Sequence, residues 1–227
     1  MYLKSAVILV TIFLCSADIS FCQESGFGVT GNIGLSKIHS NIEVEDINDK
    51  PVLSSSFGFF FEKNIKSKFG FGAKLLWVSL NSETEENTEL HTIDSETLMR
   101  QVVGSRTTLI SFKSNYIGVP IYYFHTLNKL KIKTGIQSML LLNTKSRFKN
   151  NIFFEGEASQ SEGENSNFEF NKLDLGIMLG ISYDLTNKLS LASSVYYGIL
   201  NVDKESNNSG KRNRQITLGL NYYIHSF

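Results

Sequence analysis

Three shortages stand out in this chain of 227 residues, which has two cysteines, two prolines and no net charge. Both cysteines, Cys15 and Cys22, lie near the N-terminus, so a small secreted domain held together by disulfides is excluded. Two prolines are too few for a Pro-rich disordered linker. Equal numbers of basic and acidic residues argue against nucleic acid as a partner, because its binders carry a basic face. No run approaches the ~20 apolar residues of a membrane-spanning helix.

The N-terminal segment has the features of a secretory signal peptide. Its short apolar core, Ala6–Cys15, is preceded by a lysine, and Ser20–Cys22 is an acceptable cleavage site. Cleavage after Ala17 is a second possibility. The apolar core is too short for a membrane anchor, and neither cysteine follows the small residue that a lipoprotein signal needs. We therefore predict a signal peptide over residues 1–22 and one exported domain over residues 23–227.

Hydrophobicity in the exported part alternates with a period of two. From Leu173 to Leu185 every odd position is apolar, whereas the even positions are mostly small or charged. This alternation is typical of β-strands. Eight strands are predicted, around residues 27–36, 53–62, 68–77, 116–123, 130–142, 173–185, 189–199 and 216–224. We expect a bulge or an irregular stretch near Pro120, because proline cannot donate a ladder hydrogen bond.

The connections between the predicted strands alternate in length. Short turns are expected at residues 63–67, 125–129 and 186–188, and long polar loops at residues 39–51, 82–107, 145–166 and 203–213. Short turns at one end and long loops at the other are typical of an up-and-down membrane barrel with its turns in the periplasm. Residues 145–156 could add strands that extend beyond the membrane, so ten strands remain possible.

The predicted strands have one face of large apolar side chains and one face of small or charged side chains. A soluble barrel buries the apolar face, whereas a membrane barrel turns it toward lipid. Because small residues would leave a soluble interior empty, we predict an all-β fold, an eight-stranded antiparallel up-and-down transmembrane β-barrel. A candidate charge network in its lumen consists of Glu62, Lys74, Lys131, Lys133, Asp174 and Asp184. Ionisable groups at membrane depth often mark function, but paired charges also simply fill a narrow lumen.

Three segments resemble the PorT-like outer-membrane β-barrel family of Bacteroidota. They are the Gly-rich start Gly26–Gly34, the aliphatic-Pro strand Tyr116–Ile121 and the C-terminal strand Ile216–Phe227, which closes on an aromatic residue. Phe227 departs from the terminal pattern, since the apolar residues before it have even numbers. The resemblance implies a location in the outer membrane of a Gram-negative cell, and it implies no defined activity.

No catalytic motif is present in the sequence. The four histidines lack metal-ligand spacing, and Gly-x-Ser-x-Gly, P-loop and dinucleotide motifs are absent. We therefore expect a non-enzymatic barrel without metal or cofactor, with a structural role or an interaction role through its long extracellular loops. The expected partners are outer-membrane lipid and lipopolysaccharide, the barrel insertion machinery, and an unknown protein or ligand at the loops.

Three other functions remain open at this stage. The first is a narrow channel or a component of an outer-membrane export or assembly machine. The second is a lipid-modifying enzyme of the outer membrane. The third is a soluble, lipocalin-like ligand carrier, which would bury the apolar face that a membrane barrel exposes.

Overall fold

The computed structural model describes residues 25–39, 47–93, 100–154, 157–165, 170–204 and 210–226, and the predicted signal peptide lies outside them. Within these ranges no helix is long and apolar enough to cross a membrane. The strands are β1 Ser25–His39, β2 Ile47–Lys66, β3 Phe69–Ile93, β4 Arg100–Leu127, β5 Leu130–Phe154, β6 Glu157–Asn165, β7 Leu173–Asp184, β8 Leu189–Gly198 and β9 Arg212–Ser226.

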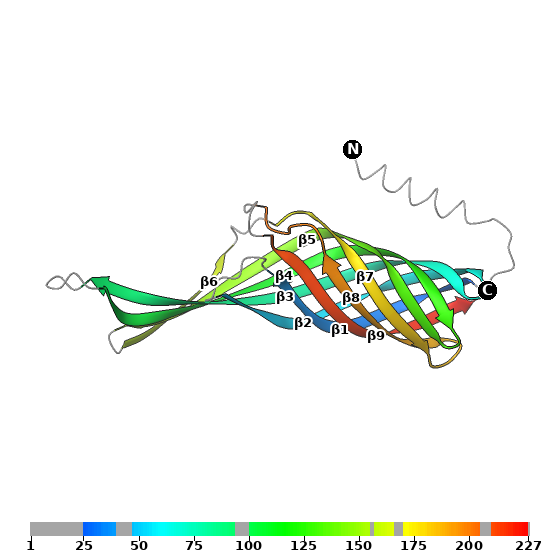
Figure 1. The fold of residues 1–227 in the computed structure, drawn as a ribbon, viewed down its shortest axis with the longest axis horizontal. Coiled ribbons are helices and arrows are strands. Elements are labelled where there is room, and N and C mark those ends of the chain that lie inside the picture. The colour runs from blue at the N-terminus through cyan, green and yellow to red at the C-terminus, as the bar shows by residue number, and fades with distance from the viewer. Residues whose placement is uncertain are drawn as a thin grey trace.

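Eight of these strands form a closed antiparallel ring (Figure 1). The order is β4-β3-β2-β1-β9-β8-β7-β5, and the pairing of β4 with β5 closes it. In the described part of the chain β6 pairs with β5 alone, outside the ring. The predicted eight-stranded barrel is therefore confirmed. Of residues 145–156, the described residues 145–154 do extend beyond the ring, as considered above, but they continue β5 and add no strand to the barrel.

Most of the large apolar side chains point outward, as predicted. Along β9 the exposed residues run from Ile216 to Ile224 at every second position, while Thr217 and Asn221 face the interior. This outward stretch is about 27 Å long, at about 3.4 Å per residue. Tilted in a barrel, it makes an apolar band of roughly 20 Å, close to that of outer-membrane barrels. A soluble carrier cannot expose such a band to water.

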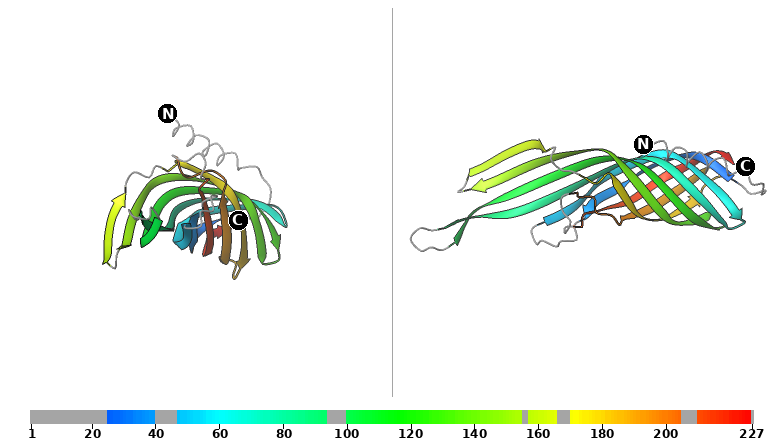
Figure 2. Two further views of the ribbon diagram at one scale, coloured as in Figure 1. Left: turned by 60° about the vertical axis from the view of Figure 1, so that its left-hand side comes forward. Right: turned by 90° about the horizontal axis from the view of Figure 1, so that it is seen from above.

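Two segments that we predicted as long loops are β-structure instead. Their described residues, 82–93, 100–107, 145–154 and 157–165, form most of the outer parts of β3, β4, β5 and β6 (Figures 1 and 2). The sequence pattern missed them because strands in water need no apolar face when a neighbour supplies every hydrogen bond of the ladder. We call residues 47–51, 82–93, 100–113, 145–154 and 157–165 the projection. It leaves the barrel at the end opposite the short turns (Figure 1).

Of the other two predicted loops, the first is shorter than expected, since β1 ends at His39 and β2 begins at Ile47. The second is longer, since β8 ends at Gly198 and β9 begins at Arg212. The short turns lie at residues 67–68, 128–129 and 185–188, close to the predicted positions. Asn128 has a φ of 55°, a left-handed conformation that asparagine tolerates better than most residues.

Pro120 lies inside β4, and the expected bulge is not at this residue. The register between β3 and β4 is the same on both sides, but the pairing is interrupted between Ala73–Ile121 and Leu76–Gly118. The nearest register shift lies between Asn115 and Tyr116, on the side facing β5. The irregular stretch therefore exists as a gap in one ladder, where proline has no N–H to donate.

Candidate functional site: the barrel lumen

Side chains from four strands meet around one carboxylate in the lumen. Glu62 of β2 accepts hydrogen bonds from Lys133 Nζ at 2.6 Å and Lys131 Nζ at 3.1 Å. The hydroxyls of Tyr122 on β4 and Tyr223 on β9 donate to the same carboxylate at 2.9 and 2.8 Å. We call these five residues the Glu62 cluster. It lies near the short turns, because each member is close to the end of its strand at that side.

The strand register explains this convergence. Inward positions are even on β2 and β4 but odd on the first half of β5, where Lys133 is buried while Ile132 and Ile136 are exposed. Glu62 pairs across the ladder with Gly72, which pairs with Tyr122. A Cβ atom at Gly72 would lie 2.4 Å from the ring of Tyr122, so glycine is required for this ring to pack against the wall.

Aromatic rings enclose the two lysines of the Glu62 cluster. Lys133 Nζ lies 5.1 Å from the ring centre of Tyr122, and Lys131 Nζ lies 5.1 Å from that of Tyr223. The ring of Phe60 packs edge-on against Tyr223, with centres 4.9 Å apart. These contacts remove the charges from water and favour the pairing of the lysines with the carboxylate.

The predicted charge network is brought together only in part. Asp184 approaches Lys131 at 3.8 Å and therefore joins the edge of the Glu62 cluster. Lys74 is half-buried and lies within electrostatic range of Lys133 and Glu62, without an ion pair to any described carboxylate. Asp174 is not part of this cluster, although its side chain is buried and faces the same lumen.

Asp174 belongs to a second polar group nearer the projection. Asn213 Nδ2 donates to its carboxylate at 2.8 Å and lies 3.4 Å from the hydroxyl of Tyr116. Met139 is the ladder partner of Asp174 on β5 and is fully buried. Asp174 is therefore stabilised by a neutral amide and has no lysine partner among the described residues.

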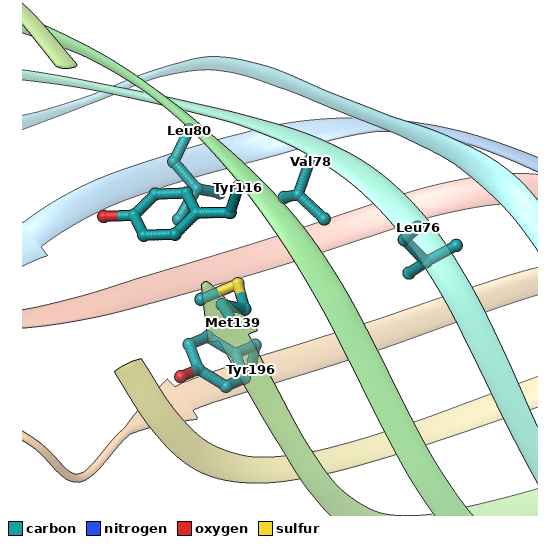
Figure 3. Packing of buried hydrophobic residues seen from close by; sticks show 6 residues of the cluster. All are labelled: Leu76, Val78, Leu80, Tyr116, Met139 and Tyr196. Carbon is teal, nitrogen blue, oxygen red and sulfur yellow. The ribbon is translucent and has the colours of Figure 1, made fainter. Parts of the chain in front are cut away.

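An apolar cluster fills the lumen near Asp174, and we did not predict it. Figure 3 shows its side chains inside the barrel, and they come from β3, β4, β5 and β8. We call it the apolar plug, and it consists of Leu76, Val78, Leu80, Tyr116, Met139 and Tyr196. The expectation of a lumen filled only by small and charged side chains was therefore wrong. A signal was present, since Leu75–Val78 is a continuous apolar run and supplies both faces of β3.

Polar pairs link the walls along other parts of the lumen. Asn32 donates to Ser56 at 3.0 Å, and Gln215 donates to Ser54 at 3.2 Å. The hydroxyls of Ser194 and Thr217 lie 2.7 Å apart. The lumen is thus crossed by the Glu62 cluster near the short turns and by the apolar plug toward the projection, while the polar pairs lie along its wall.

One ion pair of the projection lies outside the membrane band. Lys50 of β2 donates to Glu85 of β3. This hydrogen bond raises the pKa of Lys50 above its ordinary value, and it lowers the pKa of Glu85. In the described ranges no group of three or more His, Cys, Asp or Glu side chains is placed to hold a metal ion.

Comparisons with known proteins agree with this geometry. The family model described as outer membrane protein beta-barrel domain matches residues 20–204. Solved structures that resemble the fold include Ail of Yersinia pestis, with 10% identity, a TM-score of 0.41, and coverage of 89% of this chain and 99% of that one. Neisserial surface protein A has 15% identity, a TM-score of 0.45, and coverage of 88% and 99%.

OprG of Pseudomonas aeruginosa is a third similar structure, with 12% identity, a TM-score of 0.32, and coverage of 89% of this chain and 95% of that one. No curated protein matches the sequence. The family match and the outward apolar band together place the chain in the outer membrane.

Proposed function

The chain belongs to the outer membrane protein beta-barrel domain family, and from this premise we propose that it is a non-enzymatic barrel, closed to solutes, that presents the projection as an interaction surface outside the cell. The observation that carries this proposal is the continuation of β3, β4 and β5 beyond the membrane band as one paired sheet. A rigid sheet fixes its exposed side chains in space, which lowers the entropy lost when a partner binds.

The far end of the projection carries exposed apolar side chains. Val102 on β4 is 59% exposed, and Phe153 on β5 is 52% exposed. Both lie well beyond the ring, where lipid does not cover them. Exposed aromatic and aliphatic groups on a rigid, water-facing element favour binding to a protein. We therefore infer that the partner contacts the part of the paired β4 and β5 strands that lies in the projection.

The contents of the lumen support a barrel without a conducting pore. The Glu62 cluster joins β2, β4, β5 and β9 through direct contacts, and the apolar plug joins β3, β4, β5 and β8. In a narrow eight-stranded barrel such contacts leave little space for water. We expect no ion steps from the purified protein in planar bilayers, and regular steps would favour the narrow channel.

The contact with a partner can be tested by site-specific photo-crosslinking in living cells. A photoreactive phenylalanine analogue at Val102 or Phe153 should give discrete adducts, whereas the same group at lipid-facing Ile216 should give none with that partner. Equal adduct patterns at all three positions would contradict the proposal. A variant with residues 83–111 and 147–164 each replaced by Asn-Gly should still fold, because Ser82–Phe112 and Ser146–Asn165 are ladder pairs.

Within this family we propose membership of the PorT-like group of Bacteroidota. The Gly-rich segment Gly26–Gly34 lies in β1, and the aliphatic-Pro segment Tyr116–Ile121 lies in β4, which supports their use as strand motifs. We also propose that the chain contacts outer-membrane lipid, lipopolysaccharide and the barrel insertion machinery during its biogenesis. A role in an export machine predicts adducts with other outer-membrane proteins in the crosslinking experiment.

A further inference from the structure

Three cationic side chains and a tyrosine gather on the outer wall of the barrel where the apolar band ends. Along β1 the lipid-facing residues Ile33 and Leu35 are followed by Lys37, which has the same outward orientation. Along β9 the lipid-facing Ile216 is preceded on the same face by Arg214 and then by Arg212. All three cations lie at the end of the barrel that faces the projection.

The register places these side chains next to one another. Lys37 is the ladder partner of Arg214, and Arg214 is the ladder partner of Tyr197 on β8. The preceding row across the same strands is Leu35, Ile216 and Val195, all of which face lipid. Since two residues of a strand span about 7 Å, Lys37 and Arg214 lie about that far beyond the last apolar row, and Arg212 lies about 14 Å beyond it along β9. This is the depth of the lipid headgroups.

The two arginines are held in place, but their charges are not neutralised. The guanidinium of Arg214 lies 4.8 Å from the ring centre of Tyr197 and donates to its hydroxyl at 3.1 Å. Arg212 is within electrostatic reach of the same hydroxyl. Among the described residues neither arginine has a carboxylate partner, and the Nε atom of each is buried without a hydrogen-bond acceptor. In contrast, Lys211 is paired with Asp203 at 3.1 Å.

We propose that Lys37, Arg212, Arg214 and Tyr197 form a binding site for the phosphate group of an outer-leaflet glycolipid. The planar guanidinium of arginine binds phosphate through parallel hydrogen bonds, and no described carboxylate is paired with the guanidinium of Arg212 or Arg214. The apolar row below the site would contact the acyl chains of the same lipid. A free anion lacks these chains, so the site selects a lipid over inorganic phosphate.

The phosphate site rests on the proposed contact with lipopolysaccharide and specifies it, and it uses none of the residues of the proposed interaction surface. The double variant with residues 83–111 and 147–164 replaced keeps the whole site. If this variant loses its partner adducts but still binds lipid, the lipid site and the interaction surface are independent of each other. Failure of one proposal can then be distinguished from failure of the other.

The test measures binding of defined lipids to the refolded mature chain in detergent, by native mass spectrometry. The probes are diphosphoryl lipid A, the same lipid without its phosphates, and inorganic phosphate. We expect diphosphoryl lipid A to bind about tenfold or more tightly than the dephosphorylated lipid, and millimolar phosphate not to displace it. Equal binding of the two lipids, or displacement by phosphate alone, would overturn the proposal.

Matched variants locate the site. Arg212→Gln with Arg214→Gln should weaken binding of diphosphoryl lipid A about tenfold or more. Lys113→Gln with Lys145→Gln removes the same charge from an exposed ladder pair on β4 and β5 and should leave binding unchanged. Equal effects of the two double variants would mean that only the overall charge matters, and the proposal would be wrong.

Single substitutions test the site in case the double arginine variant does not fold. Arg214→Lys retains the charge but loses the planar fork, so we expect weaker binding with the gel mobility of a folded barrel unchanged. Unaltered binding by this variant and by Lys37→Gln, both folded, would contradict a phosphate site at this position.

Discussion

Replacement of Glu62 by glutamine removes the one acceptor that four donors share. The carboxylate accepts from Lys131, Lys133, Tyr122 and Tyr223 at distances of 2.6–3.1 Å. Glutamine has nearly the same volume, so the change isolates charge and hydrogen bonding from packing. One polar atom of the glutamine amide is a donor and faces groups that also donate. The two lysines therefore lose their carboxylate while they remain inside the barrel.

The expected loss of unfolding free energy is about 3–5 kcal/mol, the usual cost of removing one partner from a buried ion pair. A hydrogen bond to a charged group contributes about 1.5–3 kcal/mol, so the four bonds of Glu62 could account for more. The amide oxygen can still accept from one or two of these donors, so we expect the loss of unfolding free energy to stay within about 3–5 kcal/mol. With Lys133→Gln added, part of the stability should return, because one unpaired charge is removed.

Urea unfolding in phospholipid vesicles measures this effect, with the emission of Trp77 and the gel mobility of unboiled samples as two independent signals. Glu89→Gln in the exposed part of β3 is the control and should change stability by less than about 0.5 kcal/mol. A Glu62→Gln barrel as stable as the control would refute the reasoning. It would mean that water or a mobile counter-ion already screens the lysines of the lumen.

Other consequences of the structure can be tested in the same system. Gly72→Ala should destabilise the barrel by about 1–3 kcal/mol, because the new methyl group meets a tyrosine ring at 2.4 Å, whereas Gly31→Ala, which meets nothing within 4 Å, should be nearly neutral in the same urea unfolding. Trp77 faces lipid, so brominated acyl chains should quench its fluorescence, and unquenched emission would place it in the lumen. The pKa of Glu85 should lie below 4.5 in an NMR pH series, and it should return toward 4.5 in Lys50→Gln. The stability that comes from the lowered pKa is present above pH 4.5, and it is lost as the pH falls through the pKa of the folded state. An unchanged titration in that variant would show that the ion pair is not formed in solution.

Local alternation determined the strands and the outer face of this protein. Side chains of a strand alternate between its faces whatever the strand pairs with, so the odd apolar positions of Leu173–Leu185 predicted both an element and its orientation toward lipid. Alternation could not predict the polar strands. The outer parts of β3 to β6 have no apolar face to mark them, and only their pairing makes them β-structure.

The contents of the lumen depended on closure of the ring. Glu62 and Lys133 are 71 residues apart, and only the tilt and register of the closed barrel bring them to 2.6 Å. Asp174 has the same inward orientation, yet the register places it beside Asn213 and away from the lysines. The sequence by itself thus determined which residues face inward and which face lipid, because that choice is local. Tertiary structure decided which inward residues meet, because partners across a barrel are set by strand order and stagger.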